Sequence, residues 1–165
     1  MERVADRPHV AVCGSGDTIP EIVGLAEEVG AELARRGAVV VCGGLGGVME
    51  GACRGAKEAG GTTVGILPGR DRSAANPWVD VAIATGMDEL RNGLVVASAD
   101  ALIAVCGGLG TLTEIAFALK AGKPVVGIGT WWIARNPDDD PEDYVDVDDP
   151  REAVRLALEA AASAH

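Results

Sequence analysis

Short apolar runs alternate with longer amphipathic segments along this chain. Five runs of five or six residues are rich in valine, isoleucine, leucine and alanine, and turn residues follow each of them; they span residues 9–13, 38–42, 62–67, 101–105 and 123–128. Runs of this length between turn signals predict buried strands. Residues 79–84 and 144–147 are weaker matches to the same pattern, and we expect short strands there.

The segments between these runs repeat their apolar residues at helical spacing. In the first of them, apolar positions recur every three or four residues, at Ile22, Leu25, Ala26, Val29 and Leu33. This spacing predicts a helix that ends near Arg36, and similar patterns predict helices over 48–59, 87–98, 112–121 and 151–162. The alternation of strands and helices predicts an α/β protein with a doubly wound, mainly parallel, Rossmann-like sheet and helices on both faces.

Composition narrows the class of protein. A chain of 165 residues can form one domain with a full core, so we expect a single Rossmann-like domain over 1–165, with the polar residues 1–8 frayed. The net charge of −11 argues against binding to nucleic acid or to anionic membranes. Neither a signal peptide nor an 18-residue apolar run stands out, so we expect a cytoplasmic protein without membrane segments.

The cysteines and histidines do not form a metal-binding pattern. Four cysteines are present without any CxxC pair, and there are only two histidines, so we expect no metal site. Three of the cysteines, Cys13, Cys42 and Cys106, directly precede glycine at the end of an apolar run. This position is typical of a small buried residue where a strand meets a turn.

The strongest candidate for chemistry is the glycine-rich turn Gly107-Gly108-Leu109-Gly110-Thr111, which joins a predicted strand to a predicted helix. Such a turn directs backbone N–H groups and the positive end of a helix dipole at one point, which suits a phosphate. Thr111 can add a hydroxyl donor, and Glu114 can reach a neutral part of the same ligand. Thr111 and Glu114 also match a capping box, which is a purely structural alternative that needs no ligand.

The same five residues occur twice in the chain. Cys42-Gly43-Gly44-Leu45-Gly46 is identical to the sequence from Cys106 to Gly110, and Glu50 follows the first copy as Glu114 follows the second. Two equivalent strand–turn–helix units place their turns at the same edge of a parallel sheet, where ligands bind. We therefore expect Gly43 and Gly44 to contribute to the ligand site.

The turn after the first predicted strand begins with Gly14 and Ser15, and we expect both residues in the same site. Gly14-Ser15-Gly16 begins like a dinucleotide-binding fingerprint, but Ile19 stands where its third glycine would be. No acidic residue directly follows the second strand, which disfavours a site for NAD. Thr18 with Glu21 matches another capping box at the start of the following helix.

Residues 107–114 read Gly-Gly-x-Gly-Thr-x-x-Glu, which resembles the signature turn of the LOG (Lonely Guy) family of small Rossmann-like proteins. The resemblance extends from Val10 to about Gly127 and includes Arg91. Within this superfamily the chain most resembles a short branch that includes molybdenum-cofactor carrier proteins, through features such as Arg91-Asn92 and residues 118–125. Cytokinin-activating members have a lysine where this chain has Asn92 and a proline where it has Cys106.

The resemblance implies hydrolysis of a nucleoside 5′-monophosphate to the free base and ribose 5-phosphate, with no cofactor required. In this interpretation Gly107, Gly108, Gly110 and Thr111 hold the phosphate. Glu114 binds the ribose hydroxyls and supports an oxocarbenium-like transition state, and Arg91 positions the ribose or the attacking water.

Two other interpretations stay open. The same turn could hold a nucleotide or molybdopterin without cleaving it, as a carrier or sensor does, or the chain could be a structural α/β subunit with a vestigial site. The resemblance also implies a homodimer or a larger homo-oligomer. Paired tryptophans, Trp131 and Trp132, could stack on a base, cover a core edge or form a subunit contact.

Overall fold

Across the residues that the structure describes, seven strands form one sheet in which every neighbouring pair is parallel. The structure, a computed structural model, describes residues 2–134, 136, 138 and 141–164. The strands are β1 (His9–Gly14), β2 (Val39–Cys42), β3 (Thr62–Leu67), β4 (Val81–Ala84), β5 (Ala101–Val105), β6 (Val125–Ile128) and β7 (Tyr144–Asp146). Their order in the sheet is β4-β3-β2-β1-β5-β6-β7. The predicted strands are therefore all present, and the parallel sheet confirms the predicted class.

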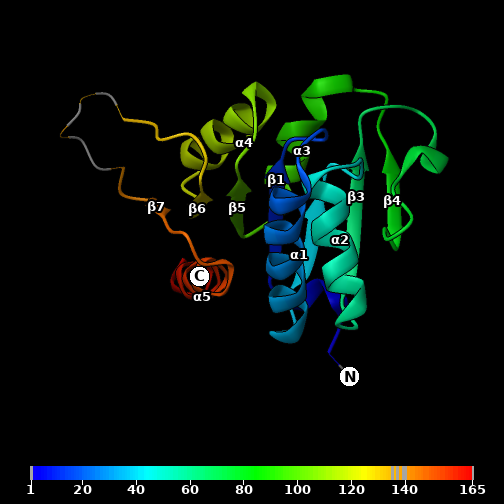
Figure 1. The fold of residues 1–165 in the computed structure, drawn as a ribbon, viewed down its shortest axis with the longest axis horizontal. Helices are drawn as coiled ribbons and strands as arrows, with labels where there is room; N and C mark the ends of the chain where they lie inside the picture. The colour runs from blue at the N-terminus through cyan, green and yellow to red at the C-terminus, as the bar shows by residue number, and fades with distance from the viewer. Residues whose placement is uncertain (1, 135, 137, 139–140, 165) are drawn as a thin grey trace.

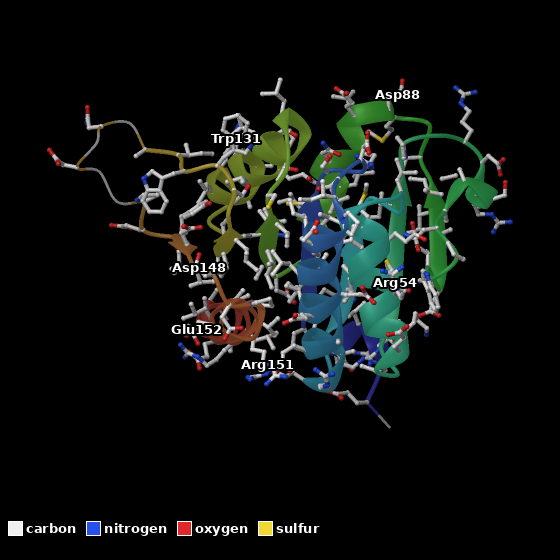
Figure 2. All side chains as sticks on the ribbon, viewed as in Figure 1. Arg54, Asp88, Trp131, Asp148, Arg151 and Glu152 are labelled. Atoms are coloured by element: carbon white, nitrogen blue, oxygen red, sulfur yellow. The ribbon has the colours of Figure 1, made fainter. Side chains whose placement is uncertain are left out.

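Helices cover both faces of this sheet, as the sequence predicts (Figure 1). The α-helices are α1 (Pro20–Arg35), α2 (Val48–Glu58), α3 (Asn92–Ala97), α4 (Leu109–Lys120) and α5 (Pro150–Ser163). α1, α2 and α5 pack on one face, while α3 and α4 pack on the other. On the outer side of the helices α1 and α2, Arg54 of α2 forms a bidentate ion pair with Glu27 of α1 (Figure 2).

The core follows from the alternation of side chains along the central strands. In β1, Val10 and Val12 face α1, α2 and α5, whereas Ala11 and Cys13 face α3 and α4. All four side chains are buried, which explains why a strand covered on both faces has a continuous apolar sequence. Each fully buried valine contributes on the order of 1.5 to 3 kcal/mol through the hydrophobic effect.

Both predicted capping boxes are wrong. Ile19 is the N-cap of α1, and it makes no side-chain capping bond; Pro20 at the first helical position starts this helix instead. The N-cap of α4 is Gly108, so the helix begins at Leu109, three residues earlier than predicted, and Thr111 lies inside its first turn. Thr111 therefore cannot cap the helix, and the structural alternative for the pair Thr111 and Glu114 is removed.

The predicted helix over 87–98 is divided into two short elements. A 3₁₀ helix, η3 (Asp88–Arg91), precedes the α-helix α3, and Asp88 has a φ of 50° that an α-helix does not allow. Two further 3₁₀ helices are η1 (Val4–Asp6), within the segment expected to be frayed, and η2 (Arg72–Ala74).

The acidic composition of residues 136–149 also predicts a solvated loop, and this prediction lies partly outside the described residues. Across the parts of the chain that the structure describes, no helix combines the length and apolar character that crossing a membrane requires.

Candidate functional site

A pocket of about 230 Å³ lies at the carboxyl ends of the central strands. β1 pairs with β2 on one side and with β5 on the other, so the strand order reverses between β1 and β5. Ligands of open α/β sheets bind at this reversal. The pocket is lined by Cys13, Gly14, Ser15, Gly16, Gly43, Met49, Arg91, Asn92, Gly108, Gly110, Thr111 and Glu114.

The turn between β5 and α4 presents backbone donors to this pocket. Gly107 has a φ of 102°, a backbone conformation that favours glycine. A Cβ at this position would lie 2.2 Å from the hydroxyl oxygen of Thr111, so the glycine makes room for the Thr111 side chain. Among the described residues, no protein acceptor takes the backbone N–H of Leu109, Gly110 or Thr111. These are the N–H groups that a helix leaves unpaired at its start. The turn can therefore donate several hydrogen bonds to an anion.

Glu114 faces the pocket from the second turn of α4 and is only 7% exposed. Burial raises the pKa of its carboxyl group to about 7, although the charge of Arg91 and a hydrogen bond from the Cys13 thiol both act in the opposite direction. The pKa of the Cys13 thiol is itself raised well above its usual value, because the thiol is buried beside this carboxylate. The carboxyl group can thus gain or lose a proton near neutral pH.

Arg91 is held at the edge of the pocket by backbone and side-chain acceptors. Its Nε donates to the Ile66 carbonyl at 2.8 Å, and another guanidinium nitrogen donates to Oδ1 of Asn92. A Cβ on Gly43 would lie 2.6 Å from the guanidinium, so this glycine makes room for the arginine. The structure places Arg91 in the same pocket as Glu114.

Asn92 connects the arginine to the glycine turn. It is 6% exposed, and its amide donates to the Thr113 hydroxyl at 3.2 Å. Thr113 in turn donates to the carbonyl of Gly110 at 2.6 Å. The position of Arg91 is therefore linked through two side chains to the first turn of α4.

The structure brings together most of the site residues that the sequence predicts. Gly14, Ser15, Gly43, Arg91, Gly108, Gly110, Thr111 and Glu114 line the pocket, whereas Gly44 and Gly107 do not. The Ser15 side chain is engaged within its own turn, since its hydroxyl donates to the Asp17 carbonyl at 2.7 Å. Gly44 lies inside the protein, where its N–H donates to the Cys42 sulfur and its carbonyl accepts from Asn76.

Four lining residues are absent from the predicted site, namely Cys13, Gly16, Met49 and Asn92. Cys13 was interpreted only as a small residue at a strand end, and Met49 was not considered for the site. The signal for Cys13 was its place directly before the first glycine turn, at the carboxyl end of a central strand. Within the described part of the chain, no three His, Cys, Asp or Glu side chains gather in a way that could hold a metal ion.

The fold and the pocket define a Rossmann-like α/β protein with its cleft at the strand-order reversal. A sequence model of the SLOG cluster4 family matches residues 7–154, and the chain belongs to this family. A cytokinin riboside 5′-monophosphate phosphoribohydrolase of Mycobacterium tuberculosis is 36% identical over 128 residues, which are 72% of this chain and 68% of the relative.

Two solved structures are similar over almost the whole chain. The molybdenum cofactor binding protein of Rippkaea orientalis has a TM-score of 0.83 and 34% identity, over 93% of this chain and 96% of that one. A Moco (molybdenum cofactor) carrier protein of Chlamydomonas reinhardtii has a TM-score of 0.82 and 37% identity, over 95% and 99% of the two chains.

Proposed function

We propose that the pocket binds a phosphate-bearing, nucleotide-like ligand. The N–H groups of Leu109, Gly110 and Thr111 would hold the phosphoryl group, together with the Thr111 hydroxyl. Arg91 supplies a positive charge at the same pocket, although the chain as a whole carries a net charge of −11. A local site of this kind depends on directed donors and not on the overall charge.

We further propose that the protein hydrolyses a nucleoside 5′-monophosphate to its base and ribose 5-phosphate. The observation that carries this proposal is the buried carboxyl group of Glu114, whose pKa is about 7, in the same pocket as Arg91. The similarity to the mycobacterial phosphoribohydrolase supports the same reaction class.

In this reaction water adds to the anomeric carbon of the ribose, and the bond from that carbon to the base nitrogen breaks. The departing base takes up a proton, so that one water molecule is consumed for each nucleotide. Ionised Glu114 would stabilise the positive charge that develops on the ribose ring, and it would accept hydrogen bonds from the ribose hydroxyls. Arg91 would position the ribose or the attacking water.

The test is release of ribose 5-phosphate from AMP by the wild-type protein and by two glutamate variants. We expect Glu114→Gln to lose about 100- to 1000-fold in kcat, in the range of removing one charge-stabilising group, while still binding AMP. Glu50→Gln is the matched control, because Glu50 follows the other copy of the turn and does not line the pocket. Full activity of Glu114→Gln would contradict a hydrolase that uses this carboxylate.

A carrier of molybdopterin or of an intact nucleotide is the second candidate function. The similarity to the molybdenum cofactor binding protein spans 93% of the chain, and Asn92 stands where cytokinin-activating proteins have lysine. The phosphate of a pterin would fit the same N–H groups. A carrier should co-purify with a pterin or nucleotide, or gain several degrees in melting temperature when one is added. Absence of both effects would exclude this function.

We also propose that the protein is a homodimer. Large apolar side chains are exposed on and around α3 and α4, with Leu90 at 74% and Leu109 at 72% exposure, joined by Met87, Leu94 and Phe117. Such side chains favour contact with a second copy. Sedimentation of the wild type and of Leu90→Glu would test this, since a dimer should become a monomer in the variant. A single domain over residues 1–165, a cytoplasmic location and the absence of nucleic-acid binding stay predictions.

A further inference from the structure

The last residue of β6 and the segment that follows it make three hydrogen bonds to the turn between β5 and α4. The Ile128 carbonyl accepts from the N–H of Cys106 at 2.9 Å. The Thr130 hydroxyl donates to the carbonyl of Cys106. The indole Nε1–H of Trp131 donates to the carbonyl of Gly108 at 3.0 Å. A segment that lines none of the pocket therefore fixes the peptide groups of a turn that does.

These bonds determine where the N–H groups of the turn point. In a trans peptide the carbonyl and the following N–H point in opposite directions. The Gly108 carbonyl accepts from both Trp131 and the N–H of Leu112, so the N–H of Leu109 is directed out of the start of α4. By the same geometry, the bond from Thr130 to Cys106 sets the direction of the Gly107 N–H.

Trp131 is itself held from the edge of the sheet. The hydroxyl of Tyr144 in β7 donates to the Trp131 carbonyl at 2.6 Å. This phenol occupies the place that a side chain at Gly127 would need, since a Cβ there would lie 2.4 Å from the phenol oxygen. The indole lies against α4, at the same end of the sheet as the pocket (Figure 2).

We propose that Thr130 and Trp131 are positioning residues for the phosphate-binding turn. They do not contact the ligand; before it binds, Trp131 sets the direction of the Leu109 N–H toward the phosphoryl group, and Thr130 fixes the neighbouring Gly107 peptide group. This inference rests on the proposed binding function. It assigns the first tryptophan of the pair a role in preorganising an anion site, because preorganised donors need no rearrangement when the ligand arrives.

The neighbouring Trp132 provides a matched control. Its ring meets Tyr144 edge-on, with the ring centroids 5.0 Å apart, and its side chain is 51% exposed. Trp131→Phe and Trp132→Phe make the same chemical change one residue apart, and only the first removes the donor to Gly108.

The experiment measures AMP binding by titration calorimetry for the wild type and both variants, with thermal unfolding alongside. We expect Trp131→Phe to weaken AMP binding by about 3- to 10-fold, the effect of one neutral hydrogen bond, and Trp132→Phe to stay within about twofold of the wild type. The two melting temperatures should be similar. Equal AMP affinity in the two variants would overturn the proposal.

Thr130 gives a second measurement if Trp131→Phe does not fold. Thr130→Val removes the hydroxyl donor at nearly constant shape, and Thr130→Ser keeps it, so we expect weaker AMP binding in the first and near wild-type binding in the second. Weak binding in both, or in neither, would contradict a role for the hydroxyl.

Amide NMR spectra of the ligand-free protein separate this inference from the proposed function. If the wild type binds no AMP, the binding function fails for this nucleotide. The position of the Leu109 amide signal still tests the positioning role, since we expect it to shift in Trp131→Phe and not in Trp132→Phe. An unchanged signal in Trp131→Phe would overturn the inference.

Discussion

The two copies of Cys-Gly-Gly-Leu-Gly have identical residues and different surroundings. In the turn after β2, Cys42 is fully buried, and Leu45 packs beside a small cluster that contains Met49 and Cys53. In the turn after β5, Gly108 is exposed, and Leu109 is exposed to 72% of its surface. The same sequence is therefore mostly buried in the first copy and mostly exposed in the second, where Gly108 and Gly110 line the pocket.

The difference arises where each following helix begins. α2 begins at Val48, after Gly47 with a φ of 61°, and the N–H of Val48 donates to the Ser15 carbonyl. α4 begins at Leu109, only three residues after Cys106, and its first N–H groups have no acceptor among the described residues. An earlier helix start leaves donors facing the pocket, and it brings Glu114 to the pocket while Glu50 stays outside. Identical turns thus acquire different roles from the residues that follow them.

The largest expected contrast concerns the dependence of stability on pH. Folded Glu114 keeps its proton up to about pH 7, whereas an unfolded glutamate releases it near pH 4.5, so the folded state binds more protons between these values. The contribution of this group to the free energy of unfolding therefore falls as pH rises through this window, by on the order of 3 kcal/mol.

Urea unfolding of the wild type and of Glu114→Gln at pH 5 and pH 8 tests this directly. Every other titrating group is common to the two proteins, so the difference between them isolates Glu114. We expect Glu114→Gln to gain stability relative to the wild type as pH rises. A constant difference would show that this carboxyl group has an ordinary pKa.

A second contrast replaces one glycine in each copy of the turn by alanine. Gly44 has a φ of 79° and Gly107 a φ of 102°, so both Gly44→Ala and Gly107→Ala should cost about 1 to 2 kcal/mol or more in backbone strain. We expect AMP affinity to fall about tenfold or more only in Gly107→Ala, because its Cβ would displace Thr111. Similar losses of AMP affinity in the two variants would remove the distinction between the turns.

A smaller difference is expected between variants of the two buried asparagines, one beside each turn. Asn76 donates to the Leu45 carbonyl at 2.9 Å, and Asn92 links Arg91 to Thr113. We expect Asn76→Leu to lower the free energy of unfolding by about 1 to 3 kcal/mol with little change in AMP affinity. Asn92→Leu should instead lower the rate of AMP hydrolysis, by about tenfold. Urea unfolding and ribose 5-phosphate release on both variants measure the contrast, and the opposite assignment of effects would contradict it.

The sheet could be predicted from the sequence because strands buried on both faces have continuous apolar runs bounded by turn residues. The starts of α1 and α4 were predicted less well, since the capping boxes expected at Thr18 and Thr111 do not form and the N-caps are Ile19 and Gly108. Gly108, Thr111 and Glu114 could be placed at the pocket because they belong to one local motif. The contacts of Cys13 with Glu114 and of Trp131 with Gly108 could not be predicted, because only the order of strands in the sheet brings those segments together.

The most direct measurement is a crystal structure of the Glu114→Gln variant with AMP, which should bind the nucleotide without cleaving it. We expect the phosphate to accept hydrogen bonds from the N–H groups of residues 109–111, with the ribose against position 114. A phosphate bound instead at residues 42–47, or one that leaves the first turn of α4 uncontacted, would contradict the assignment of the phosphate site to the second turn.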